Sequence, residues 1–214
     1  MFVLEGNIGA GKTTLLNRLK AIYPDVEVVP EPVCKWVECM DSSGQSIFQK
    51  FYEDPERFAF AFQMYVTLTR LRNTEEKSES PVPVKNALSL FERSVYSDKH
   101  VFMQTLTDSG VVSEIESNIY NAWFDRVTPP PESVSGIIYL KVDPEECHKR
   151  IAQRNRDCEG AITPSYLQQL HASHERWLSN APNVLVIKDC SDTELAMVHA
   201  FMEKRCAIKR TMKE

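Results

Sequence analysis

The chain has 214 residues, enough for one α/β domain with a full core and too few for two ordinary domains. Its residues are 43% hydrophobic and 26% charged, which is typical of a globular protein. A net charge of −5 argues against a general nucleic-acid-binding role, because such proteins are usually basic. No apolar run approaches the ~20 residues that a membrane-spanning helix needs, so we also expect no membrane anchor.

Cysteine usage and the start of the chain bear on location. The six cysteines include no C-x₂-C pair, so neither a zinc site nor a disulfide framework is expected, and a reducing compartment fits. A glycine-rich loop begins at Gly6, which leaves no room for a signal or transit peptide ahead of it. We therefore expect a cytoplasmic enzyme. The cysteines are Cys34, Cys39, Cys147, Cys158, Cys190 and Cys206.

The first predicted elements form a phosphate-binding unit. Residues 2–4 are apolar and predict a strand, and the sequence GNIGAGKTT that follows fits G-x-x-x-x-G-K-[ST]. Backbone N–H groups of such a loop, and the helix that begins there, bind phosphate groups. Lys12 is expected to reach the β- and γ-phosphates, and the Thr13 hydroxyl to bind Mg²⁺. The predicted nucleotide-binding residues here are Gly6, Asn7, Ile8, Gly9, Ala10, Gly11, Lys12, Thr13 and Thr14.

The rest of the chain alternates apolar runs with helical patterns. That alternation predicts a five-stranded parallel sheet with helices on both faces, in a single domain over residues 1–214. Helices are expected to begin at Pro55, Pro144 and Pro164, each of which follows a good N-cap residue. Polar, proline-containing stretches at 74–85 and 128–135 are expected to be loops. The predicted strands are 2–4, 26–29, 87–91, 136–142 and 184–187.

Two acidic motifs follow predicted strands. Glu31 follows the second strand, at the edge where open α/β sheets bind ligands, and could accept a proton from an attacking hydroxyl. Glu92 and Arg93 follow the third strand, where an acid helps to hold Mg²⁺ and an arginine could bind a phosphate or pair with Glu31. On spacing alone, a solvated loop carboxylate and a simple strand-end ion pair remain alternatives.

Two helices carry residues suited to ligands. Arg150 and Arg154 share a helix face and Arg156 lies just beyond, as in a lid over transferring phosphates, placed at about residues 150–162. A solvated cationic face is the alternative. The helix from residue 55 to about 74 carries an apolar stripe interrupted by Gln and Arg, which suits the wall of a ligand site, and Tyr52 precedes it. The stripe consists of Phe62, Gln63, Val66 and Arg70.

Together these motifs resemble the deoxyribonucleoside kinases, the group of deoxycytidine, deoxyguanosine, mitochondrial thymidine and insect multisubstrate kinases. The resemblance runs from residue 3 to about 189 and implies the P-loop kinase fold with an arginine-bearing lid. It also implies ATP and Mg²⁺ as cofactors, a deoxynucleoside as acceptor, and a homodimer. The motifs are GNIGAGKTT, EPVCKW, FYEDPERFAFAFQMYVTLTRLR, FERSVYSDKHVF, GIIYLKVDPEEC and HKRIAQRNRDCEG.

The resemblance implies a role for each candidate residue. Glu31 resembles the general base on the 5′-hydroxyl, Arg93 the arginine beside the 5′-oxygen, and Glu92 the acid on the magnesium side. Lys12 and Thr13 would serve ATP and Mg²⁺. Tyr52 and Glu159 resemble the pair that binds the sugar 3′-hydroxyl, and Gln63 resembles the glutamine on the base edge. The walls around the base would be formed by Phe62, Phe102, Trp36 and Val33. The lid arginines would be Arg150, Arg154 and Arg156.

Two positions bear on the base. Arg70 and Asp98 resemble a pair in the deoxycytidine and deoxyguanosine kinases, and such a pair occupies the space that a thymine methyl group needs. Val66 instead matches the insect enzymes. We expect deoxycytidine and purine deoxynucleosides to be preferred over thymidine, with their ranking open. Donor choice is open too, because residues 188–194 include no aromatic side chain to stack on adenine. A nucleoside monophosphate kinase and a non-catalytic relative are the alternatives.

Overall fold

The structure is a computed structural model that describes residues 1–78, 88–154 and 159–211. The strands are β1 (Phe2–Glu5), β2 (Val26–Val29), β3 (Leu88–Glu92), β4 (Gly136–Leu140) and β5 (Val184–Ile187). The helices are α1 (Lys12–Ile22), α2 (Val33–Glu38), α3 (Ile47–Glu53), α4 (Pro55–Ser78), α5 (Val95–Ser97), α6 (Gln104–Asp108), α7 (Glu114–Val127), α8 (Pro144–Arg154), α9 (Pro164–Leu178) and α10 (Asp192–Thr211). Shorter turns are π-helical at Asp98–Met103 and 3₁₀ at Pro131–Ser133 and Glu159–Ala161.

The described strands form one parallel sheet in the order β2-β3-β1-β4-β5, which confirms the predicted α/β fold. β1 lies in the middle because its apolar residues are buried on both faces, and Phe2 is aligned with Leu90 on one side and Gly136 on the other. The chain order reverses direction at β1. Ligands of open parallel sheets bind at such a switch point, beyond the carboxyl ends of the strands.

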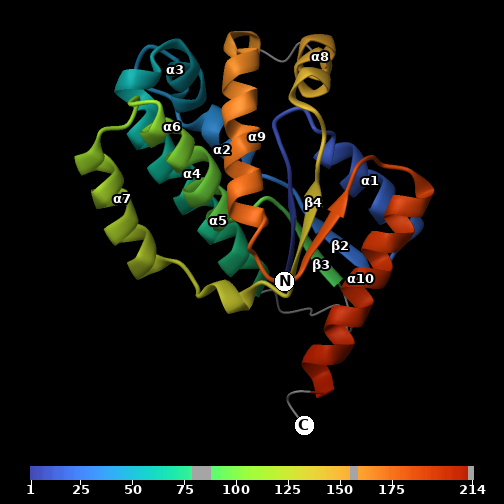
Figure 1. Cartoon of the computed structure of the whole chain (residues 1–214). Coiled ribbons are helices and arrows are strands. Elements are labelled where there is room, and N and C mark those ends of the chain that lie inside the picture. Colours follow the sequence, from blue (N-terminus) through green and yellow to red (C-terminus); the bar gives the residue numbers. More distant parts are fainter. Residues whose placement is uncertain (79–87, 155–158, 212–214) are drawn as a thin grey trace.

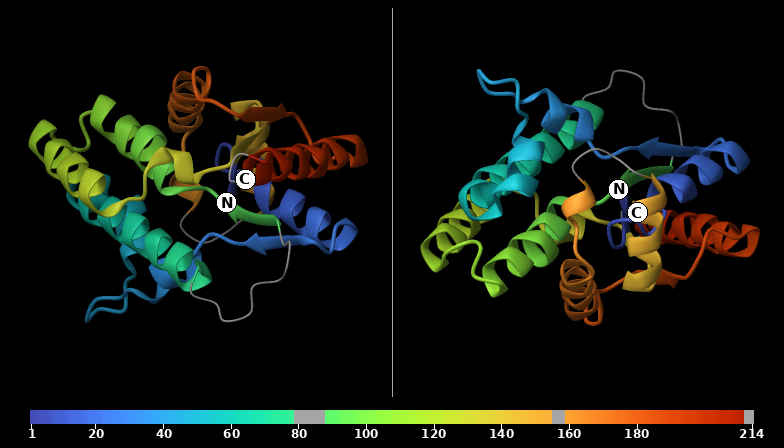
Figure 2. Two further views of the ribbon diagram at one scale, coloured as in Figure 1. Left: turned by 90° about the horizontal axis from the view of Figure 1, so that it is seen from below. Right: turned by 90° about the horizontal axis from the view of Figure 1, so that it is seen from above.

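Helices cover both faces of the sheet, as predicted. α1 and α10 pack on one face, while α4, α5 and α9 lie on the other, with α6 and α7 further out (Figures 1 and 2). A second apolar cluster lies away from the sheet, where α3 and α4 pack together, and Phe62 and Trp36 belong to it. This second cluster supplies one wall of the candidate site.

Helix starts follow the prolines as predicted: α4, α8 and α9 begin at Pro55, Pro144 and Pro164. The predicted loop at 74–85 is wrong at its beginning, because α4 continues to Ser78. The Thr74 hydroxyl donates to the Arg70 carbonyl within the helix, and the glutamates and lysine that follow are good helix formers. The rest of that predicted loop, and the predicted strand start at residue 87, lie outside the described residues. Within the described part of the chain, no helix has the length and apolar character of a membrane span.

Candidate active site

A cavity of about 630 Å³ opens at the carboxyl ends of the strands and contains most of the predicted site residues. Gly6, Asn7 and Ala10 belong to the same loop but do not line the cavity, and Arg156 lies outside the described residues. The predicted residues that line it are Ile8, Gly9, Gly11, Lys12, Thr13, Thr14, Glu31, Val33, Trp36, Tyr52, Phe62, Gln63, Val66, Arg70, Glu92, Arg93, Asp98, Phe102, Arg150, Arg154 and Glu159.

The phosphate loop is held against β4, α8 and α9. At Gly9, with φ of 76°, an added Cβ would lie 2.5 Å from the Cys147 carbonyl oxygen, so only glycine fits. The Asn7 side chain donates to the Leu167 carbonyl at 2.9 Å and accepts from the Ile8 N–H at 2.9 Å. The loop is therefore shaped by its neighbours before any phosphate binds.

Lys12 and Thr13 lie where the loop meets α1. Lys12 Nζ donates to the carbonyls of Gly6 (3.2 Å) and Asn7 (2.9 Å), and burial lowers its pKa to about 8, with nearby Arg93 acting in the same direction. Thr13 Oγ1 lies 3.2 Å from Glu92 Oε1. Adjacent hydroxyl and carboxylate oxygens are hard donors, so this pair fits the coordination chemistry of Mg²⁺.

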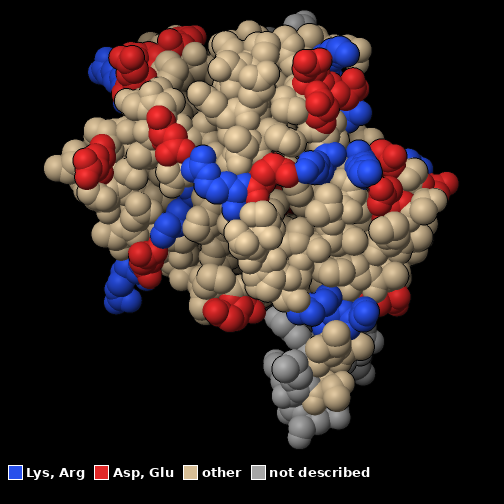
Figure 3. Space-filling model, viewed as in Figure 1, with Lys and Arg blue, Asp and Glu red and all other residues tan. Residues whose placement is uncertain are grey.

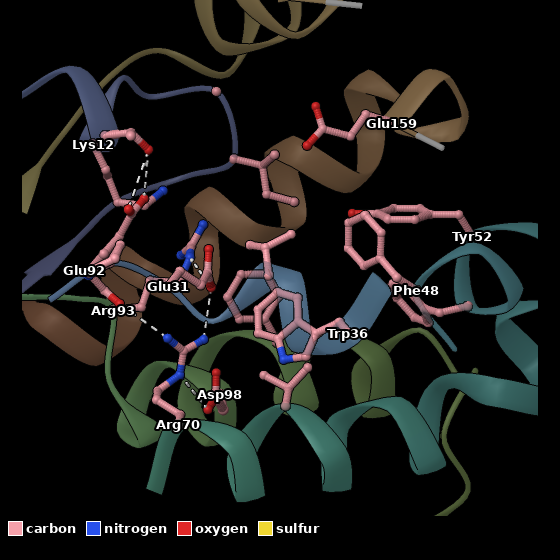
Figure 4. A pocket seen from close by; sticks show the side chains of 18 of the residues that line it. Lys12, Glu31, Trp36, Phe48, Tyr52, Arg70, Glu92, Arg93, Asp98 and Glu159 are labelled. Carbon is pink, nitrogen blue, oxygen red and sulfur yellow. Dashed lines mark hydrogen bonds and ion pairs between the residues drawn. The ribbon is translucent and has the colours of Figure 1, made fainter. Parts of the chain in front are cut away.

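Glu31 is the centre of a buried charge network (Figure 4). Its Oε1 accepts from Arg70 at 2.8 Å and lies 3.4 Å from Arg93 Nε. Arg70 also pairs with Asp98 at 2.9 Å. Burial acts to raise the pKa of Glu31, but the two guanidinium groups outweigh it and hold that pKa below its usual value. Glu31 is therefore ionised at neutral pH.

Arg93 has an unusual backbone. Its φ is 62°, in the left-handed region that non-glycine residues rarely adopt. Its N–H donates to the Leu4 carbonyl at 2.9 Å, and its side chain donates to the Gly6 carbonyl at 2.9 Å. The guanidinium lies 4.7 Å from the centre of the Phe102 ring. Arg93 thus joins the phosphate loop to the aromatic part of the cavity.

The other side of the cavity is lined mainly by aromatic side chains. Gln63 is 2% exposed, and its Oε1 has no hydrogen-bond partner among the described residues. Trp36 packs edge-on against Phe62, and its Nε1 donates to Thr69 at 2.9 Å. A buried amide oxygen without a partner is costly, so it is suited to a ligand that donates a hydrogen bond there.

Tyr52 and Glu159 lie together toward one end of the cavity, away from Lys12 and Glu92 (Figure 4). Burial raises the pKa of Tyr52, so its phenol stays protonated and can donate a hydrogen bond. Glu159 is 4% exposed and pairs with Arg154 of α8 at 2.5 Å. Arg150, one turn earlier, donates to the Ala10 carbonyl of the phosphate loop at 2.9 Å. The two described arginines of the predicted lid therefore contact both the phosphate loop and Glu159.

Sequence reasoning missed further lining residues, chiefly Phe48, Phe51 and Tyr166. Phe51 stacks on Phe62 with ring centres 4.7 Å apart, and Phe48 packs edge-on against Tyr52. The spacing of Phe48, Phe51 and Tyr52 on one helix face was a usable signal. Tyr166 offered no such signal, because it reaches the cavity only through the position of α9.

Comparison with known protein sequences identifies the family of this chain. The profile described as deoxynucleoside kinase matches residues 2–214. The chain belongs to the deoxynucleoside kinase family. The deoxycytidine kinase of Rattus norvegicus is 40% identical over 191 residues, covering 82% of this chain and 74% of the rat enzyme. The deoxycytidine kinase of Homo sapiens is 38% identical over 191 residues, covering 82% and 74%. The mitochondrial deoxyguanosine kinase of Xenopus laevis is 32% identical over 194 residues, covering 82% and 72%.

These relatives confirm the resemblance drawn from the motifs. The chain is an ATP-dependent phosphotransferase that acts on deoxynucleosides. Neither alternative considered from the sequence, a nucleoside monophosphate kinase or a non-catalytic relative, agrees with this assignment.

Proposed function

We propose that Glu31 removes the proton from the 5′-hydroxyl of a deoxynucleoside as ATP transfers its γ-phosphoryl group to that oxygen. The observation that supports this most is the position of Glu31, an ionised carboxylate between the phosphate loop and the aromatic pocket (Figure 4). Phosphoryl transfer passes through a loose transition state, so the acceptor needs positioning more than a strong base. A carboxylate with a lowered pKa therefore suffices, provided that it is ionised.

The phosphate side would be neutralised by cations. Lys12 would contact the β- and γ-phosphates, and Arg93 the oxygen that is attacked. Thr13 and Glu92 would hold Mg²⁺, which supplies charge neutralisation on the phosphate oxygens when bound. Arg150 and Arg154 would close over the transferring group as part of a lid at about residues 150–162, and we extend that role to Arg156.

On the acceptor side, different residues would bind the sugar and the base. Tyr52 and Glu159 would bind the 3′-hydroxyl, one as donor and the other as acceptor. The Gln63 amide would pair with the base edge, which gives its buried oxygen a partner. Phe62, Phe102, Trp36, Val33 and Val66 would form the walls around the base.

We propose that deoxycytidine and purine deoxynucleosides are preferred over thymidine. Arg70 and Asp98 support this, because the pair is 2.9 Å apart, almost fully buried and lines the cavity, where it would occupy the space that a thymine methyl group needs. The similarity to deoxycytidine and deoxyguanosine kinases points the same way. Salvage of deoxynucleosides in the cytoplasm follows as the proposed role.

The decisive experiment is a kinase assay against the four deoxynucleosides with Glu31→Gln. We expect this variant to lose at least about 100-fold in kcat, which is in the range for removing a general base. Glu38→Gln, an exposed neighbour on α2, is the matched control and should keep wild-type turnover. Near-wild-type turnover of Glu31→Gln would contradict the proposal. Turnover of deoxycytidine monophosphate in preference to deoxycytidine would favour a monophosphate kinase instead.

Base preference is tested by Arg70→Met combined with Asp98→Ala. The double variant frees space near the base and removes polar groups that have no partner in thymine. We expect the thymidine-to-deoxycytidine ratio of kcat/KM to rise about 10-fold or more, which is the usual effect of one pocket contact on the ratio of kcat/KM between two substrates. An unchanged ratio would mean that the pair has a structural role only.

We also propose that the protein is a homodimer. Ile115 and Ile119 lie one turn apart on α7 and are 70% and 52% exposed, and Leu68 on α4 is 36% exposed. Thr67 and Tyr120 are hydrogen-bonded at 2.7 Å and join these two helices. Sedimentation of the wild type and of Ile115→Lys with Ile119→Lys would test this, with a monomeric variant as the expected result. A wild-type monomer would contradict it.

Nucleic acid is not among the proposed partners. On the face seen in Figure 3, positive and negative side chains are interspersed rather than gathered in a basic stripe. Nucleic-acid binding would require such a stripe along the phosphate path. The proposed ligands are therefore the deoxynucleoside, ATP and Mg²⁺.

A further inference from the structure

Glu5 is a buried acid that the reaction described above does not use. It is the last residue of β1, directly before Gly6, and its side chain is fully buried. Its Oε1 accepts from Ser94 Oγ at 2.7 Å, and its Oε2 has no hydrogen-bond partner among the described residues. Burying a carboxyl group at the end of a core strand is unfavourable, so an apolar residue would serve packing better.

Through Ser94, Glu5 is connected to the turn after β3. Ser94 Oγ accepts from the Ser97 N–H at 3.3 Å, and the Ser94 N–H donates to Ser97 Oγ at 3.2 Å. Because the Ser94 hydroxyl proton is directed to Glu5, its lone pairs are left to cap α5. The carboxyl group of Glu5 thus fixes the orientation of this cap.

The residue before this cap is Arg93, whose left-handed backbone is strained and persists only where its surroundings enforce it. Ser94 is the nearest such constraint on the C-terminal side of Arg93. From this backbone the Arg93 side chain reaches Gly6 and lies 3.4 Å from Glu31. A change in the turn would therefore move the guanidinium relative to Glu31.

We propose that Glu5 is a positioning residue: through Ser94 it holds the turn from which Arg93 reaches Glu31 and the transferring phosphate. The inference rests on the role proposed above for Arg93 and Glu31. It concerns the geometry of the reaction and not the affinity for ATP, since Glu5 lies beneath the phosphate loop and does not line the cavity.

Titration of Glu5 gives a signature that packing alone would not. Burial raises the pKa of Glu5 to about 7, while Arg93 and the Ser94 hydrogen bond act in the opposite direction. The charged groups that face it are Arg93 after β3, Arg70 on α4 and Lys12 on α1. Below its pKa the carboxyl is neutral and Arg93 remains with Glu31. Above it, ionised Glu5 competes with Glu31 for the Arg93 charge, so kcat is expected to fall.

The test compares Glu5→Gln, Glu5→Leu and Ser94→Ala in steady-state assays with ATP and deoxycytidine. Gln keeps an acceptor for Ser94, so we expect kcat within about 3-fold of wild type, whereas Leu and the Ser94 variant should lose about 10- to 100-fold, as for a misplaced catalytic group. The KM for ATP should change less than about 3-fold. Ser135→Ala is the control and should leave kcat unchanged, because Ser135 is also a buried serine but directly precedes β4, at the end of that strand away from the cavity.

A pH series separates positioning from packing. The ratio of wild-type to Glu5→Gln kcat should fall by about 3-fold or more as the pH rises from about 6 to about 9, because residue 5 ionises only in the wild type and other titrations are common to both proteins. A constant ratio, or Ser94→Ala with wild-type kcat, would overturn the inference, and Ser94→Ala decides it even if Glu5→Leu does not fold. Loss of activity in Glu31→Gln, with Glu5 and Ser94 variants unaffected, would leave the proposed function standing and reject this inference alone.

Discussion

The two halves of the cavity are built in different ways. The proposed donor half is centred on one continuous segment, residues 6–14, whose backbone groups and Lys12 would face the phosphates of ATP. The acceptor half is assembled from side chains on α2, α3, α4, the π-helical turn and the Glu159–Ala161 turn. Glu31 and Arg93 lie between the halves. The donor half is formed by neighbouring residues in the sequence, so its contacts should be nearly the same for every acceptor. The acceptor half depends on packing between elements.

This difference predicts how substitutions act. Changes in the donor half should lower turnover equally for every deoxynucleoside, because the phosphates are common to all reactions. Changes in the acceptor half should alter the preference among deoxynucleosides, or the stability of the fold, since these side chains also belong to a core cluster. Four experiments test this difference between the two halves.

Lys12→Met should have the largest effect. We expect a loss of about 10³-fold in kcat, the scale of losing one preorganised electrostatic contact to the transition state, and the same factor for all four deoxynucleosides. Lys20→Met, on the exposed side of α1, is the matched control. A loss in kcat that differs strongly between deoxycytidine and deoxyguanosine would show that the two halves of the cavity are coupled.

Asp98→Ala should mainly reduce stability. It leaves the Arg70 guanidinium buried with Glu31 as its remaining carboxylate partner, and breaking a buried pair in this way costs about 3–5 kcal/mol of unfolding free energy. Adding Arg70→Met should recover most of that loss. Urea denaturation of the two single variants and the double variant measures the coupling. Additive effects would show that the pair contributes no interaction energy.

The third effect is a change in the pH dependence of kcat, expected when Arg70 and Asp98 are both replaced. Arg70 and Arg93 hold the pKa of Glu31 below its usual value of 4.5, so Glu31 stays ionised above that pH and its protonation should not affect wild-type kcat there. Removing Arg70 together with Asp98 takes away the larger of these two effects and raises the pKa of Glu31. We then expect kcat of the double variant to fall about 3-fold between about pH 7 and pH 5, as Glu31 is protonated. A flat profile in the double variant contradicts this.

Thr69→Val should have the smallest effect. Trp36 loses its hydrogen-bond acceptor, which costs about 1–3 kcal/mol, and its ring is less well fixed in the base pocket. The acceptor KM should rise about 3-fold, and the ATP KM should stay unchanged. Thr67→Val removes a similar buried hydrogen bond, to Tyr120, on the same helix but away from the pocket. Equal changes in acceptor KM for both variants would assign the effect to general destabilisation.

Local patterns in the sequence were sufficient for the sheet, the phosphate loop and the proline-marked helix starts. Strands and loops of this kind are encoded by short apolar runs and by glycine spacing, and the structure places them within two residues of the prediction. The end of α4 differs from the prediction because residues 75–77, Glu-Glu-Lys, are polar and yet good helix formers. Helix propensity, rather than polarity, is the signal that predicts this extension.

Local sequence patterns predict the phosphate loop and the acidic and arginine residues that follow the strands. The pairing of Arg70 with both Glu31 and Asp98, the place of Phe48 and Phe51 in the cavity wall, and the contact between Glu5 and Ser94 are seen in the tertiary structure alone. These contacts join residues 28 to 89 positions apart. No local pattern encodes such pairs, because they depend on which helix faces meet across the sheet and on how much water their packing excludes.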